Sequence, residues 1–239
     1  MREGGKLAKA AAAGHHGEQR LAAWAGPPPR EVVDAAGRRR YPVTAVPTRF
    51  DLQTIREKLA DRAPVRQDRP DVTRRAAVAA ILRPAGDDTE VLLIRRAERL
   101  NDPWSGHMAF PGGHHDPIDP DLLATAMREA HEEVGLDLGQ HEYLGQLDEL
   151  PAMARGRFVG MVIAPYVFAV RGSPPLVPND EVAALVWGRL GQMASGAIDD
   201  IKELSYEGEL RRLPAYRVEG NVVWGMTHFM LQSLFSAIA

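Results

Sequence analysis

The chain has 239 residues, of which 45% are hydrophobic, and it carries a formal net charge of -3 at pH 7 with no cysteine. This length and apolar content suffice for one sizeable core, so we expect one large domain. The charge balance gives no excess of cationic surface, which argues against a dedicated nucleic-acid or anionic-membrane binder. The lack of cysteine excludes disulfides, thiolate zinc sites and cysteine nucleophiles, so any chemistry must use oxygen and nitrogen ligands.

The first part of the chain differs in composition from the rest. Residues 1–47 are rich in Ala, Gly, Pro and Arg without a sustained period, which predicts a flexible arm ahead of a domain at 48–239. No run approaches the roughly 18 consecutive apolar residues of a membrane helix, and the beginning lacks an apolar segment with a cleavage site. We therefore expect a soluble, cytoplasmic protein, with an organelle-type presequence as the weaker alternative.

The domain pattern indicates an α/β sandwich with strands, one central helix, more strands and a closing helix. A short amphipathic helix is expected within residues 50–63, ended by Pro64. Two apolar runs joined by a Gly-Asp-Asp turn predict a hairpin or two adjacent strands over residues 74–97. Further strand candidates are residues 143–150 and 158–170, residues 181–190 mix strand and helix signals, and residues 227–239 are expected to form a helix packed on the sheet.

The central helix is well signalled at both ends. Asp119 suits the N-cap position, Pro120 suits the first helical position, and Gly135 suits the position after the end. The pattern therefore predicts a helix from Pro120 to Val134. Its expected buried stripe consists of Leu123, Met127 or Ala126, Ala130 and Val134.

Three glutamates on this helix repel one another unless a cation joins them. At about 100° per residue, Glu129, Glu132 and Glu133 fall within an arc of about 100°, so all three can face one point. They lie in the C-terminal half, where the helix dipole is already negative. Hard divalent ions such as Mg²⁺ or Mn²⁺ take carboxylate oxygens and share their remaining positions with phosphates. We expect a Mg²⁺ or Mn²⁺ site, against the alternative of a solvated acidic face.

The surrounding residues resemble the signature of the Nudix hydrolases. That signature reads Gly, five residues, Glu, seven residues, Arg-Glu, an aliphatic residue, any residue, Glu-Glu, any residue, Gly and an aliphatic residue. The second half matches from Arg128 to Leu136 if Ala130 is allowed as the aliphatic residue, whereas Asp119 stands where Glu is usual, with eight intervening residues instead of seven. The resemblance covers about residues 72–239 and implies a Nudix-type α/β/α sandwich with a mixed sheet and a central catalytic helix.

By this resemblance, Glu129, Glu132 and Glu133 are the metal-binding glutamates, and Arg128 orients Glu129 or Glu132 through an ion pair. Local physics agrees, because Arg128 lies one turn before Glu132 and a guanidinium can fix a carboxylate rotamer. The backbone of Gly112 and Gly113 carries no side chain and can approach the metal or a phosphate closely.

Three more residues have candidate roles, two directly after the glycines and one on a later loop. His114 and His115 follow the glycines and could contact a phosphate or a nucleobase, although histidines at such places more often face solvent. General base duty belongs to one glutamate of the cluster or to a carboxylate on a later loop, for which Glu181 is the candidate. For Glu181, an exposed residue that opens a strand is the equal alternative.

The segment before the glycines bears on the substrate. "RRAERLNDPWSGHMAFPGG" is similar to the pattern of the branch that cleaves coenzyme A, and it implies Arg96 as a substrate contact. Asn101 or Asp102 occupies the place of a second arginine there, although Arg99 could substitute from a neighbouring position. Arg155, in a loop before a strand, is a further candidate phosphate contact.

The resemblance implies an enzyme, a Nudix-type diphosphatase that hydrolyses a phosphoanhydride bond with Mg²⁺ or Mn²⁺. The expected substrate is coenzyme A or its thioesters. The alternatives are the same chemistry on ADP-ribose, NADH or dinucleoside polyphosphates, or a non-catalytic nucleotide-binding sensor. We expect a small nucleotide as partner, with no nucleic acid and no membrane. The sequence leaves open the physiological substrate, the number and identity of the ions, the general base, the role of the arm and the oligomeric state, a homodimer included.

Overall fold

The structure is a computed structural model that describes residues 49–100, 102, 104–154, 157–206 and 208–239, together with two short strands before them. The chain divides into two compact units, residues 1–45 and 46–239. In the first unit, β1 (Val32–Val33) and β2 (Arg39–Arg40) pair antiparallel. Apart from these strands, the arm predicted for residues 1–47 lies outside the described residues. In the part of the chain that is described, no helix is long and apolar enough to cross a membrane.

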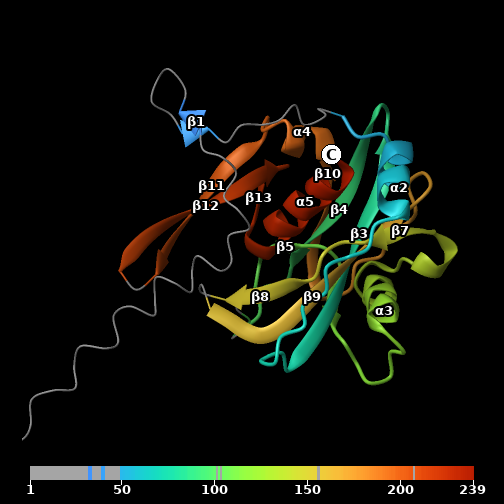
Figure 1. Ribbon diagram of the computed structural model, residues 1–239, viewed down its shortest axis with the longest axis horizontal. Helices are drawn as coiled ribbons and strands as arrows, with labels where there is room; N and C mark the ends of the chain where they lie inside the picture. The colour runs from blue at the N-terminus through green and yellow to red at the C-terminus, as the bar shows by residue number, and fades with distance from the viewer. Residues whose placement is uncertain are drawn as a thin grey trace, which may run out of the picture. The chain divides into compact units, whose positions relative to one another are not determined.

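The second unit is built on an eight-stranded mixed sheet (Figure 1). The strands along its main path, in spatial order, are β10 (Val182–Arg189), β4 (Asp88–Arg96), β3 (Arg74–Ala85), β9 (Arg157–Ala169) and β7 (Glu142–Gln146). The parallel pair is β3 with β9, and the predicted hairpin over residues 74–97 is confirmed by the antiparallel pairing of β3 with β4. The short strands β5 (Met108–Ala109), β6 (Gly112–His114) and β8 (Leu150–Ala154) pair with β4, β3 and β9.

β3 is buried on both faces because helices cover both sides of the sheet. Its side chains alternate between two hydrophobic clusters, as the two-residue period of a strand requires. Ala77, Ala79 and Ile81 pack in one cluster with α3 (Leu122–Val134). Ala76, Val78, Ala80 and Leu82 pack in the other with α2 (Leu52–Ala60) and α5 (Gly225–Ile238). The predicted first and last helices of the domain are thus present, and α5 packs on the sheet as expected.

The central helix α3 begins two residues later than predicted. Asp121 is the N-cap instead of Asp119, and its carboxylate accepts a hydrogen bond from the Ala124 N–H at 2.8 Å. Pro120 therefore lies before the helix. The end is as predicted, because Gly135 adopts the left-handed conformation with φ of 70° and caps the last turn.

The buried face of α3 agrees in part with the predicted stripe. Ala126, Ala130 and Val134 are fully buried, whereas Leu123 and Met127 are only partly buried and pack at the edge of the cluster. The prediction named either Met127 or Ala126 for one position of the stripe, and Ala126 is the buried one.

Two predicted segments divide into separate elements. Residues 143–150 belong to β7 and to the start of β8, which pair one after the other with β9 and are separated by residues 147–149. Residues 181–190 form β10 and then begin the short helix α4 (Leu190–Ala194). The 3₁₀ turn η1 (Leu138–Gln140) connects α3 to β7.

The sequence pattern did not predict a second, three-stranded sheet near the end of the chain. It consists of β11 (Asp199–Tyr206), β12 (Glu209–Val218) and β13 (Asn221–Trp224). The β11–β12 hairpin extends away from the larger sheet (Figure 1). Charged pairs such as Glu203 opposite Arg212 line it, so the apolar alternation that identifies a half-buried strand is weak.

Candidate active site

Gly112 and Gly113, which follow the bend at Pro111 and begin β6, form the glycine turn, and this turn lies directly against α3. The Gly112 N–H donates a hydrogen bond to Glu133 Oε2 at 2.8 Å. At Gly113 an added Cβ would lie 2.5 Å from Glu129 Oε1, so only glycine lets this carboxylate rest against the backbone. The pairing of β6 with β3 fixes the turn, because Gly112 is opposite Val78 and Gly113 opposite Ala77. Two glutamates of the helix are thereby held beside one stretch of bare backbone.

The two glutamates occupy a poorly solvated place. Burial raises the pKa of the Glu133 carboxyl to about 7, against the hydrogen bond from Gly112 and the charge of Arg96. Burial likewise raises the pKa of Glu129 above its usual value, against the charge of Arg128. The charge of Glu129 raises the pKa of Glu133 further, and the charge of Glu132 raises the pKa of Glu129 further. The site therefore holds negative charge that the described residues compensate only in part.

Arg128 forms ion pairs with three carboxylates around the helix. Its guanidinium contacts Glu129 Oε1 at 3.0 Å and Glu132 Oε2 at 3.1 Å, so the predicted ion pair is present with both glutamates. Both carboxylate oxygens of Asp119 accept hydrogen bonds from the same guanidinium, at 3.0 and 3.1 Å. The His114 carbonyl accepts a further hydrogen bond from it at 3.2 Å.

Asp119 is itself held in place and is nearly inaccessible to solvent. Its side chain is 5% exposed, and it accepts a hydrogen bond from the Thr125 hydroxyl at 2.8 Å. The hydrogen bonds from Arg128 hold the pKa of this carboxyl down, at about 2. Asp119 therefore stays ionised at neutral pH and fixes the orientation of Arg128, a role that the sequence pattern did not assign to it.

Glu132 differs from the other two glutamates. Its side chain is 53% exposed and turned to Arg128. Among the described residues, no group of three or more carboxylate or imidazole side chains is already gathered closely enough to hold a metal ion. Glu129 and Glu133 are thus placed together at the glycine turn, while Glu132 stands at its outer edge.

Glu181, a candidate from a later loop, lies close to this pair. Its charge raises the pKa of both Glu129 and Glu133. Backbone hydrogen bonds place its loop, because Asn179 N donates to the Glu133 carbonyl at 3.1 Å and Ala97 N donates to the Glu181 carbonyl at 2.7 Å. The Glu181 carboxylate accepts a hydrogen bond from Arg99 Nη1 at 3.0 Å, and both side chains are substantially exposed.

Two of the arginines expected to bind substrate, Arg96 and Arg99, lie near Glu133 and Glu181. Arg96 pairs with Asp102 at 3.0 Å, and its charge acts on Glu133. Its Nε is buried and has no hydrogen-bond partner among the described residues. Arg99 reaches the site through Glu181. Arg155 and Asn101 lie outside the described residues.

The two histidines after the glycines point to different faces of the sheet. His115 shares a hydrogen bond with the Thr125 hydroxyl at 2.9 Å, on the α3 side. Partial burial, followed by the charges of Arg74 and Arg96, lowers the pKa of His114 below its usual value. His114 therefore lies among basic side chains that the sequence alone did not bring together.

The donor set fits a hard divalent cation. Carboxylate oxygens and backbone oxygens are the groups that Mg²⁺ and Mn²⁺ prefer, and Glu129, Glu133 and the glycine turn offer both kinds. Arg128 and Arg99 offset only part of the surrounding negative charge. A cation would relieve the repulsion that burial of these carboxylates leaves.

Comparison with known proteins identifies the family. Residues 73–206 match the NUDIX domain family. The chain is 34% identical over 169 residues, 70% of its length and 80% of the relative, to a protein described as uncharacterized Nudix hydrolase NudL from Yersinia pestis (strain Pestoides F). A solved C. elegans Ap4A hydrolase is 21% identical with a TM-score of 0.43, over 52% of this chain and 85% of that one. The NUDIX domain of Shewanella oneidensis NrtR, solved with ADP ribose, is 18% identical with a TM-score of 0.37, over 61% and 82%. On the extent of the domain match and the identity to the Yersinia relative, the chain belongs to the Nudix hydrolases, enzymes that hydrolyse diphosphate bonds.

Proposed function

We propose that this enzyme is a divalent-metal-dependent hydrolase of a nucleoside diphosphate derivative, with Glu129, Glu132, Glu133 and the Gly113 backbone holding the ion. Nudix hydrolases generally use divalent metal ions, and Mg²⁺ or Mn²⁺ is the cofactor that suits these ligands. The observation that carries the proposal is the contact of the buried Glu133 and the partly buried Glu129 with the glycine turn. Bound there, the ion would lower the pKa of water and neutralise charge on the phosphate oxygens.

Residues of the chain supply orientation for this chemistry. Arg128, fixed by Asp119, holds the Glu129 carboxylate in one rotamer and leaves it little freedom to turn away. The Gly112 N–H does the same for Glu133. Such fixed groups favour catalysis because no side chain has to reorganise as charge develops on the phosphate.

Glu181 is the proposed general base. It lies near Glu129 and Glu133, and its partner Arg99 is exposed enough to exchange the carboxylate for a substrate phosphate. This exchange would free the Glu181 oxygen that accepts the proton from the attacking water. A glutamate of the cluster, Glu129, remains the alternative base.

The substrate we favour is coenzyme A or a thioester of it. Arg96 and Arg99, on the segment that resembles the coenzyme A branch, lie near Glu133 and Glu181 respectively. One observation favours the rival substrates ADP-ribose, NADH and dinucleoside polyphosphates. Asp102 occupies the place of the second arginine of that branch. It pairs with Arg96 and so reduces the electrostatic attraction of Arg96 for a phosphate.

A nucleotide sensor without turnover is the less favoured function. A buried carboxylate beside a partly buried one costs stability, and a protein that only binds an anionic nucleotide gains nothing from the pair. A hydrolase, in contrast, uses these carboxylates to hold its metal ion.

A substrate panel at fixed Mn²⁺ or Mg²⁺ tests the proposal. Purified full-length protein is incubated with coenzyme A, acetyl-coenzyme A, ADP-ribose, NADH and diadenosine tetraphosphate, and the products are separated by chromatography. We expect phosphopantetheine and adenosine bisphosphate from coenzyme A, with the highest kcat/KM in the panel. A higher value for another compound transfers the assignment to it, and inertness toward every compound with either metal rejects the hydrolase proposal.

A further inference from the structure

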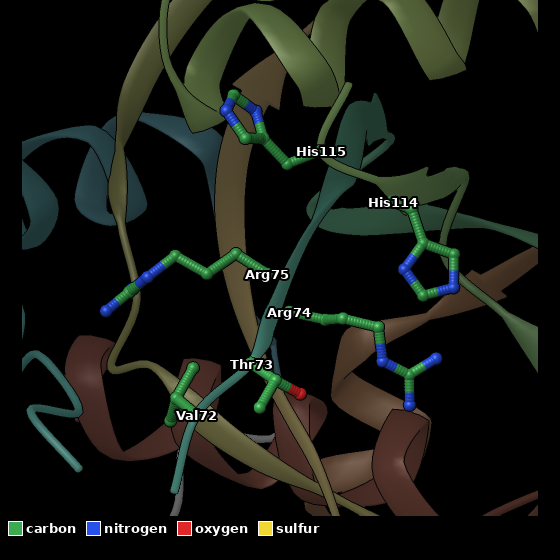
Figure 2. Close-up of a pocket in the computed structure, with 6 residues that line it drawn as sticks. All are labelled: Val72, Thr73, Arg74, Arg75, His114 and His115. Carbon is green, nitrogen blue, oxygen red and sulfur yellow. The ribbon is translucent and has the colours of Figure 1, made fainter. Parts of the chain in front are cut away.

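A basic pocket lies beside the glycine turn, where β3 begins and β6 ends. Its volume is about 620 Å³, within the range of sites that hold small molecules. Its lining contains no acidic residue and consists of Val72, Thr73, Arg74, Arg75, His114 and His115 (Figure 2). His114 directly follows Gly113, so the pocket adjoins the proposed metal site.

Two of these basic side chains are already engaged on the α3 side. Arg75 Nη1 contacts both oxygens of Glu149 at 3.2 Å, and the Glu149 side chain is 3% exposed. His115 is bound to the Thr125 hydroxyl. Figure 2 shows Arg75 extending away from Arg74, as neighbours on a strand must. Arg75 and His115 therefore stabilise the fold through these contacts.

Arg74 and His114 share the opposite face. Ala76 is directly opposite His114 in the β3–β6 pairing, and Arg74, two residues before Ala76, points to the same side. Figure 2 shows the guanidinium and the imidazole extending to the same side of the strand. The hydrogen bond of Arg74 in the described part of the chain goes from Nη2 to the Val159 carbonyl at 2.9 Å, and no described carboxylate pairs with it.

The positive charge of Arg74 on this face is not compensated by any described carboxylate, whereas Arg96 is paired with Asp102. The charges of Arg74 and Arg96 both act on His114, and no acidic side chain lines the pocket. A guanidinium presents a fork of donors that matches a phosphate, and an imidazole adds one more N–H. The pocket is therefore suited to an anion with several oxygens.

We propose that Arg74 and His114 form a subsite for a phosphate monoester on the same molecule whose diphosphate is cleaved beside α3. This inference rests on the proposed function. Arg74 lies three residues before Ala77, the partner of Gly113 in the β3–β6 pairing, so at about 3.3 Å per strand residue the backbone positions of Arg74 and Gly113 are on the order of 10 Å apart, a span that one nucleoside can bridge. The substrate class is a nucleoside diphosphate derivative with an additional phosphate, such as the 3′-phosphate of coenzyme A, which ADP-ribose and NADH lack.

Paired substrates test the subsite by kinetics. The ratio of kcat/KM for coenzyme A to that for 3′-dephospho-coenzyme A is measured in the wild type, Arg74→Ala, Arg74→Lys and the control Arg212→Ala, which removes an exposed arginine from β12. Arg74→Ala should lower this ratio about tenfold, through KM, because a charged hydrogen-bond donor to the additional phosphate is lost. Arg74→Lys should restore part of the ratio, and Arg212→Ala should leave it unchanged. An unchanged ratio in Arg74→Ala overturns the subsite.

A binding measurement on metal-free, full-length protein separates failure of the subsite from failure of the proposed function. Calorimetry compares adenosine 3′,5′-bisphosphate with AMP, and it requires no turnover. We expect the bisphosphate to bind about tenfold more tightly, and Arg74→Ala to abolish that difference. Equal affinity of the wild type for the two probes overturns the proposal, as does an equal loss of both in Arg74→Ala, which would mean that Arg74 holds the nucleobase. Inertness toward every diphosphate rejects only the hydrolase function.

Discussion

Replacing Gly113 by alanine should move one carboxylate without unfolding the protein. The new Cβ would lie 2.5 Å from Glu129 Oε1, 2.6 Å from Cδ and 2.7 Å from Oε2. Carbon atoms pack at about 3.5 Å, so the carboxylate must retreat by about 1 Å. The obstructing atoms are the end of a flexible side chain, and a rotamer change of this kind costs on the order of 1 kcal/mol. The clash is thus relieved at Glu129, at little cost to the fold.

The Gly113→Ala substitution is expected to lower the catalytic rate. A misplacement of about 1 Å in a catalytic group lowers the rate by on the order of a hundredfold, about 2.7 kcal/mol of transition-state stabilisation. Turnover is measured with the best substrate of the panel, Mn²⁺ affinity by calorimetry and the melting temperature by calorimetric scanning. We expect kcat to fall by about a hundredfold, weaker Mn²⁺ binding and a melting temperature within a few degrees of wild type.

Two comparisons show whether the effect passes through Glu129. Adding Gly113→Ala to a Glu129→Gln variant should cause little further loss, because both changes remove the same group. Gly112→Ala should instead destabilise the fold, since its Cβ would meet the Ala77 carbonyl oxygen at 2.3 Å and the Val78 Cα at 2.6 Å, which are backbone atoms of β3. Wild-type turnover and Mn²⁺ affinity in folded Gly113→Ala would refute the assignment of Glu129 to the metal site.

Three other changes have expected outcomes. Glu133→Gln keeps an acceptor for the Gly112 N–H but removes the charge, so kcat should fall at least about tenfold with an unchanged circular dichroism spectrum; wild-type turnover would contradict the metal assignment. Asp119→Asn should cost about 2 kcal/mol in urea unfolding, because Arg128 loses its buried partner. The pKa of Asp119 lies near 2 when folded and 3.8 otherwise, so its contribution is complete above pH 3.8 and lost as the pH falls toward 2; equal wild-type and variant stability at pH 6 would disprove it. Deletion of residues 1–47 should leave kcat/KM unchanged, and a large loss would give the arm a catalytic role.

The elements that the sequence predicts well are those with local, periodic signals. β3 and β4 follow from two apolar runs around a turn, and α3 follows from its apolar stripe and from Gly135 at its end. The placement of Glu129 and Glu133 on one face also follows, because a helix turns by about 100° per residue. A helical projection gives the direction of each Cβ but not the rotamer beyond it. It therefore did not predict that Glu132 is turned to Arg128 and exposed.

Features set by distant pairing could not be predicted in this way. Asp119 and Asp121 flank Pro120 and both suit an N-cap, and the choice between them depends on Arg128 and Thr125, which occupy Asp119. The shared face of Arg74 and His114 depends on the register between β3 and β6, which no local pattern contains. The nearness of Glu181 to the glutamates likewise depends on backbone hydrogen bonds between separate loops.

The departure from the family signature at Asp119 is offset by the extra residue that follows it. Asp is one methylene shorter than the usual Glu, and an additional residue in extended backbone adds up to about 3.5 Å of reach. The chain has room for this residue before α3, because Pro120 and Asp121 lie between Asp119 and the start of the helix at Leu122. The carboxylate still grips the Arg128 guanidinium through two hydrogen bonds, at 3.0 and 3.1 Å, from a side chain that is 5% exposed. The shorter acid and the longer turn therefore act together, and Arg128 keeps the fixed orientation from which it holds Glu129.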